Sequence, residues 1–200
     1  MRITNKQYKA MQDLLHQQAV LENETGVRTI QSNRFFRDSV IGKMIDKDIA
    51  MNTENHGWDG FLKNGTFFEN KNIKAGCKSG SSFSLRFQDT SLDKLNEMDN
   101  GVFAVNSFWS KDNTPAFLMV GNTRNVSHFL NASYNPAQRK TSTVSMINCI
   151  KNGFKIVAID YSKKEVWDIL SSKFPKLGTV MTMDDICTKK DLPGLVADMI

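Results

Sequence analysis

The chain has 200 residues, of which 40% are hydrophobic and 24% are charged, with a formal net charge of +5. This is the composition of a folded globular protein, and the length is enough for one domain with a buried core. Because no apolar run reaches about eighteen residues, the sequence excludes a membrane-spanning helix. We therefore expect a single domain, residues 1–200.

Cysteine use indicates where such a protein works. Cys77, Cys149 and Cys187 are odd in number and far apart, which is typical of reduced thiols. The first residues, Met1–Lys6, precede no apolar stretch of the kind that secretion signals carry. We expect a cytoplasmic protein. Since there is no C-x-x-C pair and the histidines are dispersed, we expect no structural zinc site.

Two helices are predicted in the first quarter of the chain. Thr4 can cap a helix that runs to about Glu24, because apolar residues recur behind it at helical spacing. A second helix is expected from Asn33 to Lys47, with its apolar side towards the core.

The next segment, His56–Ile73, reads HGWDGFLKNGTFFENKNI. Two β-prone runs lie on either side of Lys63-Asn64-Gly65, and Asn-Gly between such runs is a strong hairpin signal. A loop of only Asn64-Gly65 would place Asp59 opposite Asn70. A three-residue loop, with Gly65 at positive φ, would place Asp59 opposite Glu69. We predict the three-residue loop.

In that register Asp59, Glu69 and Lys71 share one face of the hairpin, because directly opposed residues have Cβ atoms roughly 4.5–5.5 Å apart. Two carboxylates so close repel each other, and a divalent cation removes that repulsion. Mg²⁺ prefers hard oxygen ligands such as carboxylates, water and phosphate. Lys71 can hold an attacking water or offset charge on a phosphate. The pattern predicts metal-assisted hydrolysis, the alternative being an ordinary hairpin with solvated charges.

The order Gly57-Trp58-Asp59-Gly60 and then Glu69-Asn70-Lys71 resembles the active-site motif of the PD-(D/E)XK nuclease superfamily, which includes most type II restriction endonucleases. Trp58 stands where the family has a proline, a change that alters no metal ligand. The resemblance implies that Asp59, Glu69 and Lys71 are catalytic, and that Asp59, Glu69 and the Asn70 carbonyl bind metal. It also implies Mg²⁺ as the cofactor, with Mn²⁺ as a substitute.

Helices upstream of the hairpin also match this family, in which such a helix often lends the site one more acidic residue. Glu22, Glu24 and Asp38 are the candidates. Each can equally be a solvated helix charge, and we assign none of them.

The remainder of the chain alternates strands and helices. A Gly/Ser-rich loop follows the hairpin, and its Lys74 and Lys78 either approach a phosphate or belong to a plain connector. The elements expected beyond it are strands at 83–88, 102–109, 116–120 and 154–161 and helices at 90–98, 143–152 and 162–173. We predict an α/β fold with a central mixed β-sheet of four to six strands flanked by helices, which is restriction-endonuclease-like.

No acidic residue occurs between Asp112 and Asp160. A polyanion would be attracted to such a surface, although the segment can also be a neutral surface that merely lacks acids. Within it, residues 121–142 are the least regular, and we predict that they form a DNA-contacting insertion. The candidate contacts there are Arg124, Asn125, Gln138, Arg139 and Lys140.

Together these features predict a Mg²⁺-dependent endodeoxyribonuclease that cuts duplex DNA at specific sites. Because one active site addresses one strand, cutting both strands implies a homodimer. Two alternatives remain open. One is a structure-selective or repair nuclease of the same superfamily, and the other is a non-catalytic basic nucleic-acid-binding protein that needs no metal.

Overall fold

The computed structural model describes residues 1–25, 34–53, 58–75, 84–88, 101–109, 114–124, 141–176 and 186–198. These segments contain both helices and strands, in agreement with the expected α/β class. Within these segments no helix combines the length and the apolar character that a membrane crossing requires. The helix expected at 90–98 lies outside the described residues.

Both predicted N-terminal helices are confirmed. α1 (Asn5–Thr25) begins with a capping box, in which Thr4 Oγ1 accepts a hydrogen bond from the Gln7 N–H at 3.3 Å. Gln7 Oε1 in turn accepts one from the Thr4 N–H at 2.9 Å. These two bonds satisfy N–H groups that have no partner inside the helix. α2 (Arg34–Ile45) ends two residues before the expected Lys47.

The main sheet has seven strands in the described part of the chain, in the order β1-β2-β3-β5-β6-β8-β9. Neighbours are antiparallel except for β3–β5 and β8–β9, which are parallel. The prediction of four to six strands is therefore wrong in number, because strands of two residues are too short to show an apolar period. The strands are β1 (Ala50–Met51), β2 (Gly60–Phe61), β3 (Phe67–Ala75), β5 (Gly101–Trp109), β6 (Pro115–Asn122), β8 (Lys155–Ala158) and β9 (Cys187–Thr188).

A second, two-stranded sheet joins β4 (Ser84–Gln88) to β7 (Thr141–Ser145). The strand expected at 83–88 is confirmed. The helix expected at 143–152 is wrong at its start, because residues up to Ser145 are extended and the helix is α5 (Met146–Lys151). The β-branched residues Thr141, Thr143 and Val144 favour the extended conformation that the pairing with β4 then uses.

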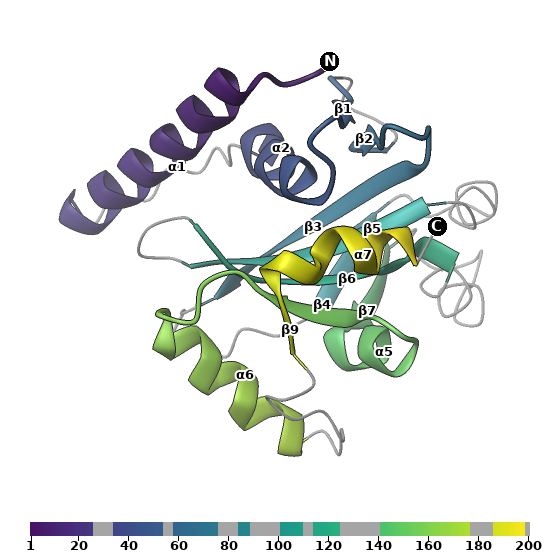
Figure 1. Ribbon diagram of the computed structural model, residues 1–200. Coiled ribbons are helices and arrows are strands. Elements are labelled where there is room, and N and C mark those ends of the chain that lie inside the picture. Colours follow the sequence, from purple (N-terminus) through teal and green to yellow (C-terminus); the bar gives the residue numbers. More distant parts are fainter. Residues whose placement is uncertain are drawn as a thin grey trace.

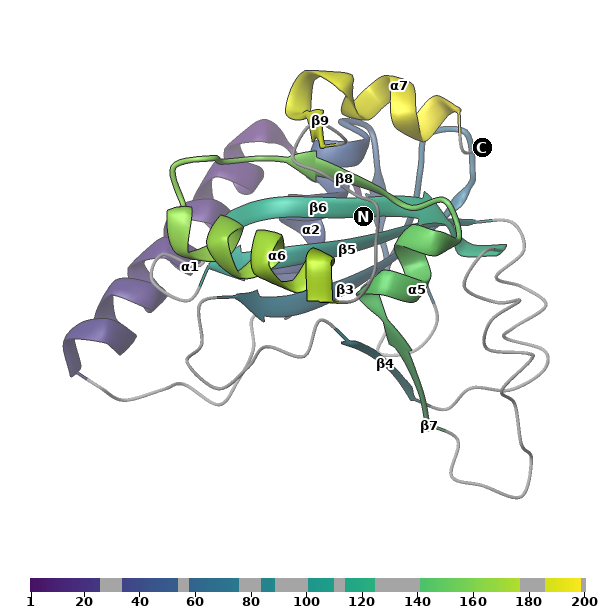
Figure 2. The same cartoon turned by 90° about the horizontal axis from the view of Figure 1, so that it is seen from below.

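Helices cover both faces of the main sheet. Figure 1 shows α1 and α2 on one side of it and α6 (Lys164–Lys176) on the other, and Figure 2 shows α6 lying across β5 and β6. α7 (Leu192–Ala197), which was not expected, joins α2 over the first face. On the second face the rings of Phe117 and Trp167 lie 6.0 Å apart. The core of the first face includes Leu15, Ile41, Ile45, Met51, Phe68, Leu118, Val120, Val157, Leu192 and Val196.

Gly121 allows a close approach between β6 and the segment that precedes β8. A Cβ at this position would lie 2.5 Å from Cγ of Phe154, a ring that is itself buried. We predict that Gly121→Ala lowers the free energy of unfolding by about 1–3 kcal/mol, because a close-packed ring cannot move aside.

Gly194→Ala is the matched control for Gly121→Ala. No atom lies within 4 Å of a Cβ added at Gly194, which stands inside α7. This exchange should raise stability by about 0.5–1 kcal/mol, since alanine favours a helix. Urea denaturation of both variants measures the difference, and equal stabilities would contradict the packing argument.

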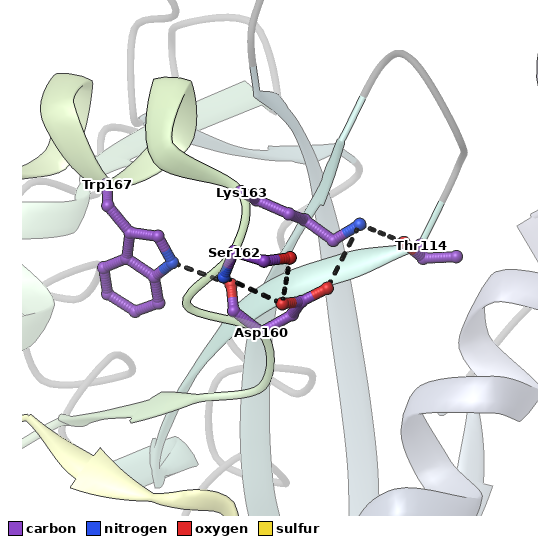
Figure 3. Close-up of polar contacts among 5 residues, drawn as sticks. All are labelled: Thr114, Asp160, Ser162, Lys163 and Trp167. Atoms are coloured by element: carbon purple, nitrogen blue, oxygen red, sulfur yellow. Dashed lines mark hydrogen bonds and ion pairs between the residues drawn. The ribbon is translucent and has the colours of Figure 1, made fainter.

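Asp160 organises the connection from β8 to α6 (Figure 3). Its Oδ1 accepts hydrogen bonds from the Ser162 N–H at 2.9 Å and from the Ser162 hydroxyl at 2.6 Å. Its Oδ2 lies 3.6 Å from Nζ of the buried Lys163, which also donates to Thr114 Oγ1 at 2.5 Å. The Asp160 carbonyl accepts the Trp167 indole N–H at 2.8 Å. These bonds tie the start of α6 to the start of β6, and α6 begins at Lys164.

Stability should depend on pH through this turn. The hydrogen bond from the Ser162 hydroxyl, followed by smaller contributions that include the charge of Lys163, lowers the pKa of Asp160 below its usual range. Since the folded pKa lies below the unfolded one, ionised Asp160 stabilises the fold above pH of about 4. That contribution is lost as the pH falls through the folded pKa.

We therefore predict that Asp160→Asn is less stable than the wild-type protein at neutral pH and that the gap narrows as the pH falls below about 4. Urea denaturation of both proteins across that range measures the gap. A gap that stays constant with pH would contradict the ionic role of Asp160.

Candidate active site on the β2–β3 hairpin

The loop between β2 and β3 has the three residues predicted from the sequence. Gly65 has φ of 87°, and its N–H donates to the Leu62 carbonyl at 2.9 Å. The Leu62 N–H donates to the Thr66 carbonyl at 2.8 Å, which makes these two residues a pair. Asn64 closes the loop, since its Oδ1 accepts the Thr66 N–H at 3.0 Å. The predicted loop length and the positive φ are both confirmed.

The strand register agrees with the predicted one. Phe61 pairs with Phe67 and Gly60 with Phe68, which is the register that the three-residue loop predicts, and Asp59 directly precedes this paired stretch. Side chains alternate between the two faces of a strand, so Glu69 shares a face with Phe67 and not with Phe68. The register therefore brings the two predicted carboxylates to the same part of the hairpin.

Asp59 directly precedes β2, at the end of the hairpin where the two strands separate. The backbone on either side is held by Asn52, whose side-chain amide donates to the Trp58 carbonyl and whose N–H donates to the Asp59 carbonyl, each at 2.9 Å. Asp59 Oδ2 accepts the Asn70 N–H at 2.8 Å. A carboxylate here takes the place that a main-chain carbonyl has in a regular ladder. The bond fixes the Asp59 side chain against β3.

Glu69 and Lys71 stand two residues apart on β3 and point to the same face. Lys71 Nζ donates a hydrogen bond to Glu69 Oε1, and the two form an ion pair. The Glu69 side chain is 5% exposed and that of Lys71 is 21% exposed. A carboxylate this deeply buried needs a charged or hydrogen-bonding partner, and Lys71 supplies one while its own chain reaches solvent.

Asn70 separates these two residues and points the other way. Its side-chain amide donates to Asp38 Oδ1 at 2.6 Å, and both residues are buried. Because N–H and C=O of one strand residue point to the same side, the Asn70 carbonyl is directed towards the edge where Asp59 lies. The predicted ligand set of Asp59, Glu69 and the Asn70 carbonyl thus belongs to one short piece of sheet.

The structure distinguishes the three upstream acidic residues that the sequence offered as possible members of the site. Asp38 on α2 contacts the hairpin through Asn70. Glu22 accepts a hydrogen bond from Gln18 Nε2 at 2.9 Å within α1, and Glu24 is exposed near the end of that helix. Asp38 is therefore the member of this group that the described contacts join to the candidate site.

Aromatic rings line the hairpin beside the carboxylates. Trp58 stacks on Phe67 with ring centroids 4.8 Å apart and planes 12° apart. Phe61 lies 5.4 Å from Phe67 and is 39% exposed. The stack of Trp58 explains why an aromatic side chain suits the position before Asp59, since it packs across the two strands.

Two of the predicted DNA contacts, Arg124 and Lys74, lie in the described part of the chain. Arg124 is exposed just after β6, where its N–H donates to Asn122 Oδ1 at 2.8 Å. Lys74 lies on β3, three residues beyond Lys71, and its backbone pairs with Phe108. The remaining candidates, Lys78, Asn125, Gln138, Arg139 and Lys140, lie outside the described residues.

Sequence reasoning missed two contributors to the hairpin. Asn52 follows a strand of two residues, so no pattern marked it. The hydrogen bond between Asp38 and Asn70 joins residues 32 positions apart, and no local sequence pattern around either residue predicts it. In the described part of the chain there is no group of three or more His, Cys, Asp or Glu side chains that could hold a metal ion. A metal here would therefore need a main-chain oxygen or water besides the two carboxylates.

No protein-family model matches the chain, and no curated protein matches it.

The loop itself can be tested by exchanging Gly65. Because no atom lies within 4 Å of an added Cβ, the cost of a side chain there comes from the positive φ alone. We predict that Gly65→Val lowers the free energy of unfolding by about 1–2 kcal/mol, whereas Gly65→Asn costs less, since asparagine adopts this conformation more readily. Thermal or urea denaturation compares the two variants. If valine were tolerated as well as asparagine, the left-handed conformation of residue 65 would be in error.

Proposed function

We propose that this protein is a Mg²⁺-dependent endodeoxyribonuclease that hydrolyses phosphodiester bonds in duplex DNA at specific sites. The observation that carries the proposal is the hairpin contact in which Asp59 Oδ2 accepts the Asn70 N–H at 2.8 Å, between Glu69 and Lys71, which form an ion pair. The resemblance of these residues to the PD-(D/E)XK motif supports the same reaction. A restriction-endonuclease-like arrangement of the mixed sheet and its helices is part of the proposal.

The side chains present fit a hard divalent cation. Asp59, Glu69 and the Asn70 carbonyl would hold it, and all three donors are oxygens, the ligand type that Mg²⁺ and Mn²⁺ prefer. Each carboxylate can accept several partners at once, so the bonds from the Asn70 N–H and from Lys71 orient the two acids without using up their capacity. When bound, the ion supplies a Lewis acid that acidifies water and stabilises the leaving oxygen.

The other parts of the reaction fall to the chain itself. Lys71 is held against Glu69 by the ion pair, and its ammonium is placed to donate to the attacking water and to offset charge on the phosphate. Water adds to phosphorus and gives up a proton to solvent, the bond from phosphorus to the leaving sugar oxygen breaks, and that oxygen takes up a proton from solvent. The Asn70 N–H keeps Asp59 in place during this exchange.

Charge distribution supports DNA as the substrate. The net charge is +5, and the span from 113 to 159 has no acidic residue. Arg124 lies exposed in that span. Cations on such a surface neutralise phosphates and make binding weaker as salt rises. Two copies of the chain, one for each strand, would cut both strands of the duplex.

We predict that the protein cuts plasmid DNA in Mg²⁺ and that a chelator stops the reaction. Asp59→Asn and Glu69→Gln should each abolish cutting, since they remove a metal ligand, while leaving DNA binding in Ca²⁺ within about threefold of wild type. Agarose gels measure cleavage, and a gel-shift titration measures binding.

Lys63→Gln is the control for these variants. Lys63 lies in the loop of the same hairpin, and its Nζ lies 3.3 Å from Asp48 Oδ2. Because its side chain is 71% exposed, its exchange should leave cleavage unchanged. DNA binding without cleavage in both Mg²⁺ and Mn²⁺ would contradict the nuclease proposal and favour a non-catalytic DNA-binding protein. Cleavage confined to branched or damaged duplexes would instead favour a repair nuclease.

A further inference from the structure

Asp38 is a buried carboxylate next to the candidate site. It is 3% exposed on α2, and its Oδ1 accepts the side-chain amide of Asn70 at 2.6 Å, a residue that is 1% exposed. A buried carboxylate is costly unless it is hydrogen-bonded or paired. Asp38 makes this bond to the middle residue of the Glu69-Asn70-Lys71 segment.

α2 is set tightly against β3. A Cβ added at Gly42, one turn after Asp38, would lie 2.8 Å from Ile49 Cδ1 and 3.3 Å from the Phe68 ring. Val40 and Ile41 are buried in the same core. The helix therefore cannot slide along the strand without steric clashes between side chains, and the position of Asp38 along β3 is fixed opposite Asn70.

A continuous set of hydrogen bonds runs from this helix to the site. Asp38 holds the Asn70 side chain, and the Asn70 N–H holds Asp59 Oδ2 at 2.8 Å. Asn70 alternates with Glu69 and Lys71, so Asp38 contacts the face of β3 opposite to theirs. Asp38 is thus connected to Asp59 through the side chain and the backbone N–H of Asn70, from the opposite face of β3.

We propose that Asp38 is a positioning residue that acts through Asn70, holding the backbone of this residue, whose N–H orients Asp59 and whose carbonyl faces the same edge. It is not itself a metal ligand. The inference rests on the proposed function insofar as the positioned group binds metal, but the hydrogen-bond relay can be measured without metal. Removal of a group that hydrogen-bonds to a metal ligand typically lowers metal affinity by about 10–100-fold.

Two exchanges separate a positioning residue from a ligand. Asp38→Asn keeps the shape and an oxygen that can accept the Asn70 amide, but it removes the charge that a metal ligand would need. Asp38→Ala removes the acceptor altogether. The double variant Asp38→Asn with Asn70→Asp reverses donor and acceptor and so restores the bond, whereas Asn70→Asp alone sets two buried carboxylates against each other.

The first measurement is Mn²⁺ binding to the full chain by titration calorimetry. We expect Asp38→Ala to weaken Mn²⁺ binding about tenfold or more, while Asp38→Asn and the double variant stay within about threefold of wild type. If Asp38→Asn bound Mn²⁺ as weakly as Asp38→Ala does, Asp38 would be a metal ligand and the inference would fail. If Asp38→Ala bound Mn²⁺ as tightly as wild type, Asp38 would have no positioning role.

The second measurement is hydrogen exchange at the Asn70 amide, followed by NMR without metal, with the Phe68 amide as the internal reference. We expect Asp38→Ala to speed exchange at Asn70 at least about tenfold relative to Phe68, and the double variant to reverse this. Equal acceleration at both amides would mean general loosening and would overturn the relay. A wild-type protein that binds no Mn²⁺ would refute the proposed function, and the exchange ratio would still decide the role of Asp38.

Discussion

The positive φ at Gly65 decides which side chains meet on the hairpin. A loop shorter by one residue would move every side chain of one strand to the other face, because the side-chain period of a strand is two. Asp59 would then face Asn70 and not Glu69. Only a residue without a Cβ, or a small polar one, adopts this backbone readily, so a single glycine outside the site sets the composition of the site.

Charge burial extends that constraint into the core. Glu69 is nearly buried and its Oε1 pairs with Lys71, while Asp38 is buried on the opposite face of β3 and its Oδ1 accepts the side-chain amide of Asn70. The segment Glu69-Asn70-Lys71 therefore provides a partner for one carboxylate on each face of the sheet. Removing Lys71 or the side-chain amide of Asn70 would take this partner from a buried carboxylate, which costs more than the pair contributes. This arrangement supports a site that stays in place before any ligand arrives.

Local patterns explain what the sequence could predict. Asn64-Gly65 between two β-prone runs is enough to place the hairpin, although its register depends on the choice of a three-residue loop over a two-residue one, and Thr4 is enough to start α1. Long-range partners have no such local signal. The bond between Asp38 and Asn70, which are 32 positions apart, is an example. Asn52 is near Asp59 in the chain, but it follows a strand too short to show a period.

The same limit accounts for the elements that were missed or misread. β7 occupies residues that sequence alone assigned partly to a helix, because its pairing partner β4 lies more than fifty positions away in the chain. A β-sheet neighbour at that distance leaves no trace in the pattern of the strand itself, and tertiary pairing overrides the local preference. The metal was inferred from the residue types and from the resemblance, the DNA contacts from the residue types, and the dimer from the need to cut two strands, and all three stay predictions.

The parallel pairing of β3 with β5 has a consequence for how the molecule is made. Phe67 to Ala75 align with Gly101 to Trp109, so the two strands are 34 positions apart in the chain. A hairpin closes within microseconds, whereas pairing of distant strands must first overcome the entropy of closing a long loop. A nascent chain that has left the ribosome only as far as Ala75 already carries both hairpin acids without the sheet that supports them. Synthesis of β5 is therefore the step after which this half of the molecule can become rigid.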